Sequence, residues 1–117
     1  MSLDAEAEAF KTRLAAATKA PVYDHDEAQK LTTLPAQYTI VHVGYRFGGN
    51  VRGGARETDL RRLTTIAVAK TVTNARLLVD RIMAEFRYSE VTFETGTVPE
   101  PDDGYYSASL DFTYVAA

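Results

Sequence analysis

The densest group of chemically active side chains is the run Asp24-His25-Asp26-Glu27. Three carboxylates beside an imidazole form a donor set that could hold a divalent cation. Neighbouring residues in an extended segment point in opposite directions, however, so they rarely converge on one ion. The run therefore favours a solvated loop. A small enzyme or metal-dependent ligand-binding domain that uses these four residues is the alternative.

A second candidate is the glycine-rich stretch from Gly48 to Gly54, which reads Gly-Gly-Asn-Val-Arg-Gly-Gly. It lacks the Gly-Lys-Ser/Thr ending of a phosphate-binding P-loop and the G-x-G-x-x-G spacing of a dinucleotide-binding fold. It also joins two segments that resemble strands. We therefore predict a flexible hairpin tip, which could become ordered on a partner.

No set of residues in the sequence combines a nucleophile, a base and an orienting group. His42 alternates within an apolar segment, and no serine or cysteine can be assigned to it. Tyr105-Tyr106 could stack on a base, but the neighbouring residues are acidic where a nucleic-acid groove needs cations. The absence of cysteine excludes disulfides, thiolate nucleophiles and cysteine-based zinc sites. We therefore expect a non-enzymatic protein with no catalytic residues, cofactor or metal.

The composition is typical of one folded domain, and we expect residues 1–117 to form it. A chain of 117 residues has room for one hydrophobic core, and 45% hydrophobic with 25% charged residues is far from a disordered composition. The net charge of −3 is unlike that of a domain that grips nucleic acid. No apolar run approaches the roughly 20 residues that cross a bilayer, and the acidic start is unlike a secretory signal. Synthesis in a cytoplasm is the expectation.

Two segments have the apolar spacing of amphipathic helices, Leu3–Thr18 and Thr71–Arg87. Ser2 can cap the first helix, and Pro21 follows its end. We expect five side chains of the two helices to face a sheet, namely Phe10, Leu14, Leu78, Ile82 and Phe86.

Four segments have the residue types and alternation of strands: Tyr38–Phe47, Leu60–Ala69, about Ser89 to Thr95, and Tyr105–Val115. The first two are expected to pair as an antiparallel hairpin. The order α-β-β-α-β-β predicts an α+β fold. Specifically, we expect a two-layer sandwich with two helices packed on one face of a mainly antiparallel sheet of about four strands.

The first of these strands is apolar on both sides. Val41, Val43, Tyr45 and Phe47 lie on one side, and Tyr38 and Ile40 lie on the other. A monomer would leave one side against water, whereas large exposed apolar patches usually mark interaction surfaces. We therefore expect Tyr38 and Ile40 to contact another copy of the chain.

The order of several features resembles a known family. A helix is followed at once by Pro21-Val22-Tyr23-Asp24, and a polar loop ends in Leu34-Pro35 before the strand Gln37-Tyr38-Thr39-Ile40-Val41. A strand at 63–69 then leads into a helix at 74–82. From Ala20 to about Tyr114, this pattern resembles the tail terminator, or tail completion, proteins of long-tailed bacteriophages.

The resemblance implies a structural virion protein at the head–tail junction. Its copies would form a hexameric ring that caps the tail tube, stops polymerisation and offers a docking surface to the head-side connector or stopper protein. DNA would pass through the bore only as cargo, and no catalytic residues come with this family. A different head-to-tail adaptor, such as a stopper, is the alternative.

Charge is distributed unevenly along the chain. Five arginines lie between Arg46 and Arg62, whereas six acids and no lysine or arginine follow Arg87. Head-to-tail contacts in a ring join two different patches of one chain, and opposite charges suit such contacts. We therefore expect the basic hairpin of one copy to face the acidic hairpin of the next. The alternatives are two ordinary solvated surfaces, or acids that line the bore. The expected interface residues of the two hairpins are Arg46, Arg52, Arg56, Asp102 and Asp103.

Overall fold

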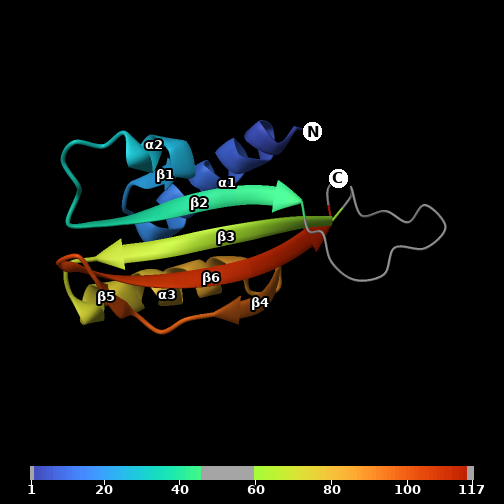
Figure 1. The fold of residues 1–117 in the computed structure, drawn as a ribbon. Coiled ribbons are helices and arrows are strands. Elements are labelled where there is room, and N and C mark those ends of the chain that lie inside the picture. The colour runs from blue at the N-terminus through green and yellow to red at the C-terminus, as the bar shows by residue number, and fades with distance from the viewer. Residues whose placement is uncertain (1, 46–59, 116–117) are drawn as a thin grey trace.

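The computed structural model describes residues 2–45 and 60–115 of the 117-residue chain. Its elements follow in the order α1 (Leu3–Thr18), β1 (Val22–Asp24), α2 (His25–Gln29), β2 (Gln37–Tyr45), β3 (Leu60–Ala69), α3 (Val72–Phe86), β4 (Thr92–Gly96), β5 (Glu100–Asp102) and β6 (Tyr105–Val115). The strands form one mixed sheet in the order β1-β2-β3-β6-β4, with β5 also paired to β6 (Figure 1). Only the β1–β2 pair is parallel among the described strands.

The two long helices pack against the same face of the sheet. In Figure 1 they lie behind the central strands β2, β3 and β6. The Ser2 hydroxyl accepts a hydrogen bond from the N–H of Ala5 and so caps α1, as predicted, and Thr71 caps α3 in the same way through Asn74. All five helix residues expected to face the sheet are buried in the core, which confirms the phase of both helices.

The central strands confirm the predicted hairpin. Strand β2 pairs antiparallel with β3, from Gln37 opposite Ala69 to Tyr45 opposite Arg61. The predicted alternation of the last strand is also confirmed. Four side chains of β6 are buried on the helix side: Ala108, Leu110, Phe112 and Tyr114. Strand β3 buries Leu63 and Ala67 on that side as well.

Aromatic rings fill one end of the core. The Phe112 ring lies 4.9 Å from Phe86 and 5.7 Å from Phe93, measured between ring centroids. Phe10 of α1 contacts Phe86 at 5.9 Å and Tyr114 at 5.1 Å, again with edge-to-face geometry. Such rings bury large apolar areas, so this cluster joins both helices to β6.

The fold is α+β, but its arrangement differs from the predicted four strands and two helices. The described residues hold six strands and three helices. Strands β1 and β5 have three residues each, too few to show an alternation. Helix α2 has five residues and replaces the predicted solvated loop. None of the described helices is both long enough and apolar enough to cross a membrane.

Strand boundaries differ as well. Strand β4 begins at Thr92 and not at Ser89, because Ser89 forms a turn after α3. Its hydroxyl donates to the carbonyl of Phe86 and accepts from the N–H of Val91. The end of the predicted strand at Phe47 and the glycine-rich hairpin tip lie outside the described residues.

Truncation of a core residue on α3 tests the helix phase. We expect Ile82→Ala to lower the free energy of unfolding by about 2–5 kcal/mol, because the fully buried side chain leaves a cavity. Arg76→Ala, on the exposed side of α3, is the matched control and should change stability by less than about 0.5 kcal/mol. Arg81 is a poor control, because its guanidinium donates to the Thr18 carbonyl at 2.8 Å. Urea denaturation measures both effects, and equal losses would contradict the phase.

Candidate assembly surface

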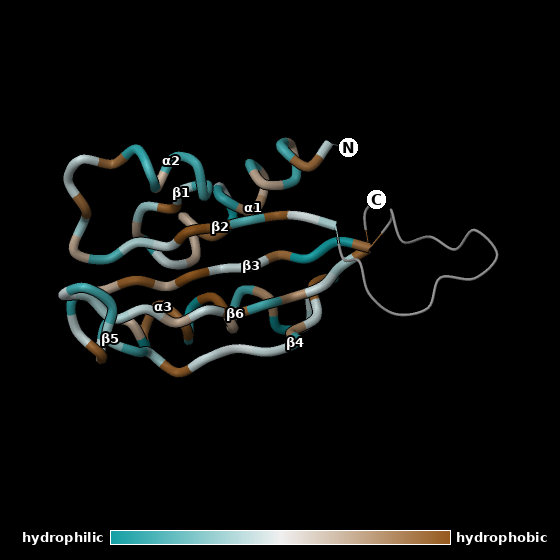
Figure 2. Tube along the Cα trace, viewed as in Figure 1, coloured by the Kyte–Doolittle hydropathy of each residue, from teal (hydrophilic) through white to brown (hydrophobic). Residues whose placement is uncertain are grey.

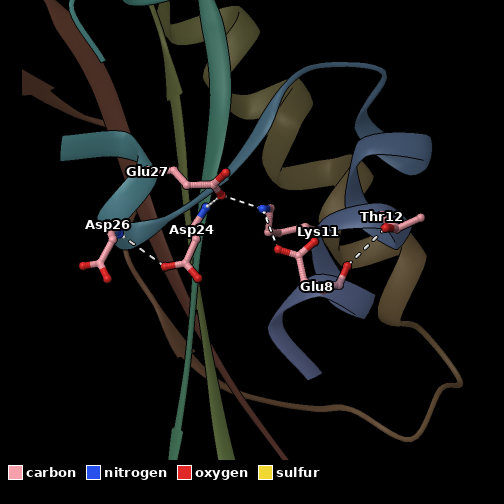
Figure 3. Close-up of polar contacts among 6 residues, drawn as sticks. All are labelled: Glu8, Lys11, Thr12, Asp24, Asp26 and Glu27. Atoms are coloured by element: carbon pink, nitrogen blue, oxygen red, sulfur yellow. Dashed lines mark hydrogen bonds and ion pairs between the residues drawn. The ribbon is translucent and has the colours of Figure 1, made fainter. Parts of the chain in front are cut away.

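The acidic run that begins at Asp24 builds a short helix (Figure 3). The N–H of Asp26 donates to Oδ1 of Asp24 at 3.2 Å, and the N–H of Asp24 donates to Oε1 of Glu27 at 2.9 Å. These reciprocal bonds are a capping box, which satisfies two donors at the start of α2. The Asp-x-x-Glu spacing was a signal for this helix that the sequence-based prediction of a loop overlooked.

The remaining side chains of the run also have partners. Lys11 of α1 forms ion pairs with Glu27 and with Glu8, and its hydrogen bond lowers the pKa of Glu27. The His25 ring is 3.1 Å from the amide nitrogen of Gln29 and packs edge-to-face on His42, with ring centroids 5.8 Å apart. The described residues contain no group of three or more His, Asp or Glu side chains placed to hold a metal ion.

A metal titration tests this interpretation of the run. Because the carboxylates of Asp24 and Glu27 cap α2, millimolar zinc or magnesium should leave the melting temperature within experimental error of its value in EDTA. By contrast, Asp24→Ala should lower the free energy of unfolding of the protein by about 0.5–2 kcal/mol, because α2 loses its cap. The control is Asp26→Ala, whose side chain accepts no such bond. If metal raised the melting temperature of the wild type but not of Asp24→Ala, the result would favour the metal-site hypothesis over this interpretation.

A buried polar network joins α1 to the start of β3 and the end of β6. Glu6 is 6% exposed, and its Oε1 accepts a hydrogen bond from the Tyr114 hydroxyl at 2.7 Å. Nε of Arg61 lies 3.4 Å from the same oxygen, and its guanidinium stacks 4.7 Å from the centre of the Tyr45 ring. Burial and the bond to Glu6 raise the pKa of Tyr114 well above its usual value. The network positions α1, and nothing in the sequence alone singled it out.

Alkaline pH tests the network. The raised pKa means that folded Tyr114 keeps its proton at a pH at which the unfolded chain loses it. Its contribution to stability is therefore complete below about pH 10 and is lost as the pH rises beyond that value. The free energy of unfolding should fall more steeply above pH 10 in the wild type than in Tyr114→Phe. At neutral pH, Tyr114→Phe should cost about 1–2 kcal/mol. Parallel pH profiles would contradict the network.

The side of the sheet opposite the long helices carries an apolar patch, here called the open face. Its residues alternate with the core residues of their strands and are Tyr23, Tyr38, Ile40, Ile66, Val68 and Tyr105. Cross-strand pairing brings them together: Tyr38 lies opposite Val68, Ile40 lies opposite Ile66, and Tyr23 lies beside Ile40. In Figure 2, β2 and β3 carry brown hydrophobic stretches, whereas α2 is teal.

Tyrosine rings cover the centre of the open face. Tyr38 is only 6% exposed, because its ring packs edge-to-face against Tyr23 at 5.9 Å and Tyr105 at 6.3 Å. This burial raises the pKa of Tyr38. Ile40 and Ile66 are half-buried beside these rings. An approaching partner would therefore meet Tyr23, Tyr105 and the two isoleucines, with Tyr38 beneath them.

The open face is bordered by polar side chains toward the end of β6. The Thr64 hydroxyl donates to Asp111 at 2.6 Å, and the Thr113 hydroxyl donates to Glu94 at 3.0 Å. Arg62 and His42 are exposed at this end of the sheet. The apolar contact area is therefore confined to the half of the sheet where β6 begins.

The other expected interface residues divide into two groups. Arg46, Arg52 and Arg56 lie outside the described residues. Asp102 and Asp103 are exposed where β5 turns into β6. Asp103 and Gly104 have φ angles of 52° and 84° there, which is typical of a tight Asp-Gly hairpin turn.

Of the open face, the sequence predicted Tyr38 and Ile40 but not Tyr23, Ile66, Val68 and Tyr105. The alternation of Ile66 and Val68 with Ala67 and Ala69 was a usable signal, since it places two more apolar side chains on the side of Tyr38. Tyr23 gave no such signal, because β1 has only three residues.

Comparison with known proteins adds no relative. No protein-family model matches the chain, and no curated protein matches it. The open face, the capping box and the buried Glu6 network therefore carry the functional argument.

Proposed function

We propose that this chain is a structural assembly protein whose copies join through the open face. The resulting ring caps a phage tail tube, stops its polymerisation and provides the docking surface for the head-side connector. The observation that carries the self-association is the apolar half of the sheet that no described helix covers. The role at the tail rests on the family resemblance of residues 20–114.

The chemistry of the described residues supports an assembly role over a catalytic one. Two acidic side chains that could do chemistry have structural partners instead: Glu6 accepts a hydrogen bond from Tyr114, and Asp24 caps α2 together with Glu27. The open face, by contrast, has an apolar half with a polar border, which is the anatomy of a protein interface. Burial of the apolar half of the open face against a second copy removes apolar area from water and so favours association.

Introduction of a charge into the open face tests the assembly. Ile66→Lys places an ammonium group in the middle of the apolar half and should convert the wild-type oligomer to monomer in sedimentation velocity. Leu77→Lys is the matched control, because Leu77 is an exposed apolar residue on α3. Circular dichroism must show that both variants are folded. Equal assembly of both variants would contradict the proposal.

Electron microscopy tests the role at the tail. Negative-stain images of the protein mixed with tail tubes should show rings at one tube end, and the tubes should stop growing when the ring is added. Ile66→Lys should fail to cap the tubes, and Leu77→Lys should cap them. Co-sedimentation with connector rings but not with tubes would favour a stopper in place of a terminator.

A further inference from the structure

An apolar pocket lies between the end of α3 and strand β4. Its volume is about 240 Å³. We call this pocket, with the neighbouring Tyr88, the aromatic corner. The residues that line the pocket are Met83, Phe86, Arg87, Val91, Phe93 and Phe112. The Phe93 side chain is 44% exposed, so the corner is open to solvent.

Tyr88 is exposed at the corner, on a turn with a defined backbone conformation. It is 99% exposed, and its φ of 60° lies in the left-handed region that a residue with a Cβ adopts at an energetic cost. The turn that imposes this conformation is held by Ser89, whose N–H and hydroxyl both donate to the Phe86 carbonyl. Because the turn already fixes the backbone at Tyr88, binding there costs less backbone conformational entropy. Arg87 beside it is exposed and forms no ion pair with any described residue.

The complementary feature is the segment Val98–Asp103, here called the proline arm. Val98 is 72% exposed, and Pro99 and Pro101 fix the backbone around Glu100. The acids Glu100, Asp102 and Asp103 are exposed and form no ion pair with any part of the chain that the structure describes. The arm is therefore a preorganised, acidic segment with one exposed apolar side chain.

A strand of another copy cannot pair along the whole outer edge of β5, because Pro101 lacks an N–H to donate. Side chains must then provide its contacts. Proline-rich segments bind grooves lined by aromatic rings, and free acids pair with a free arginine. The aromatic corner offers both partners: rings at Tyr88 and Phe93, and the guanidinium of Arg87.

The arm and the corner of one copy do not touch, because Val98 is 72% exposed and does not line the pocket. The rest of the arm pairs with β6 from Tyr105 to Ser107, whereas the corner contains Phe112. Four residues of strand lie between Ser107 and Phe112, which corresponds to a rise of roughly 17 Å. We propose that the proline arm of one copy docks in the aromatic corner of the next, with Val98 near the pocket and Glu100 near Arg87. This contact deepens the proposed function, on which it rests, because two different patches that meet without reciprocal exchange between the same two copies generate a head-to-tail series.

Cross-linking tests the contact directly, since the chain has no native cysteine. A Tyr88→Cys protein and a Val98→Cys protein, mixed and treated with a short bismaleimide, should give a covalent dimer that contains one copy of each. Leu77→Cys replaces Tyr88→Cys as the control and should give no such dimer with Val98→Cys. Dimers of Tyr88→Cys alone would indicate a twofold contact and overturn the proposal, as would the absence of the mixed dimer.

Charge reversal provides the second test. Arg87→Glu should raise the protein concentration needed for half-maximal assembly about tenfold or more, and so should Glu100→Lys combined with Asp102→Lys. Assembly should be partly restored when Arg87→Glu is combined with Glu100→Lys and Asp102→Lys in one chain. Mixing the Arg87→Glu protein with the Glu100→Lys, Asp102→Lys protein should have the same effect.

The two proposals fail in different ways. If Arg87→Glu assembles like the wild type, the arm contact is wrong and the open face can still join the copies. If the mixed Tyr88→Cys and Val98→Cys dimer forms while Ile66→Lys assembles normally, the arm contact stands and the open-face proposal is wrong. A wild type that stays monomeric and gives no mixed dimer overturns both.

Discussion

Packing of both long helices on one face of the sheet is the constraint on which the rest of the structure depends. The core face of β2, β3 and β6 is closed by Phe10, Leu78 and Ile82, which leaves the opposite face to its own side chains. Tyrosine packing over Tyr38 reduces the exposed apolar area, but Ile40 and Ile66 remain half-buried at the surface. An apolar second face on a two-layer fold is typical of an interaction surface, and the proposed self-association would cover it.

The ends of the sheet have different structural roles. At the end of β6, the Glu6, Arg61 and Tyr114 network and the Phe112 cluster fasten α1 and α3 to the strands. The polar border of the open face lies at this end. At the start of β6, the proline arm leaves its acids exposed and its backbone unsuited to continued pairing. One end therefore holds the helices to the sheet, and the other carries the exposed groups of the proposed arm contact.

The sequence predicted those parts of the fold that repeat. Helices at 3–18 and near 71–87, the β2–β3 hairpin and the alternation of β6 each extend over nine or more residues, so their periods are visible. Strands β1 and β5 and helix α2 are too short for a period to be visible. At the candidate surface, the alternation within one strand was enough to predict that Ile40 lies on the same side as Tyr38. Tyr23 and Tyr105 join it only through pairing between distant segments, and no local pattern contains that information. The Glu6 network was hidden for the same reason, since its hydrogen bond joins residues 108 positions apart.

The two proposed surfaces have complementary physical roles. In these proposals, apolar contact at the open face supplies affinity, and the charged arm and corner define which two patches meet. A closed assembly is the central consequence, and native mass spectrometry of the wild-type protein at micromolar concentration tests it most directly. We expect one discrete oligomer that remains the dominant species over a wide concentration range, with the six subunits that the resemblance to tail terminator proteins implies. A spectrum that contains only monomer at every concentration would contradict the account.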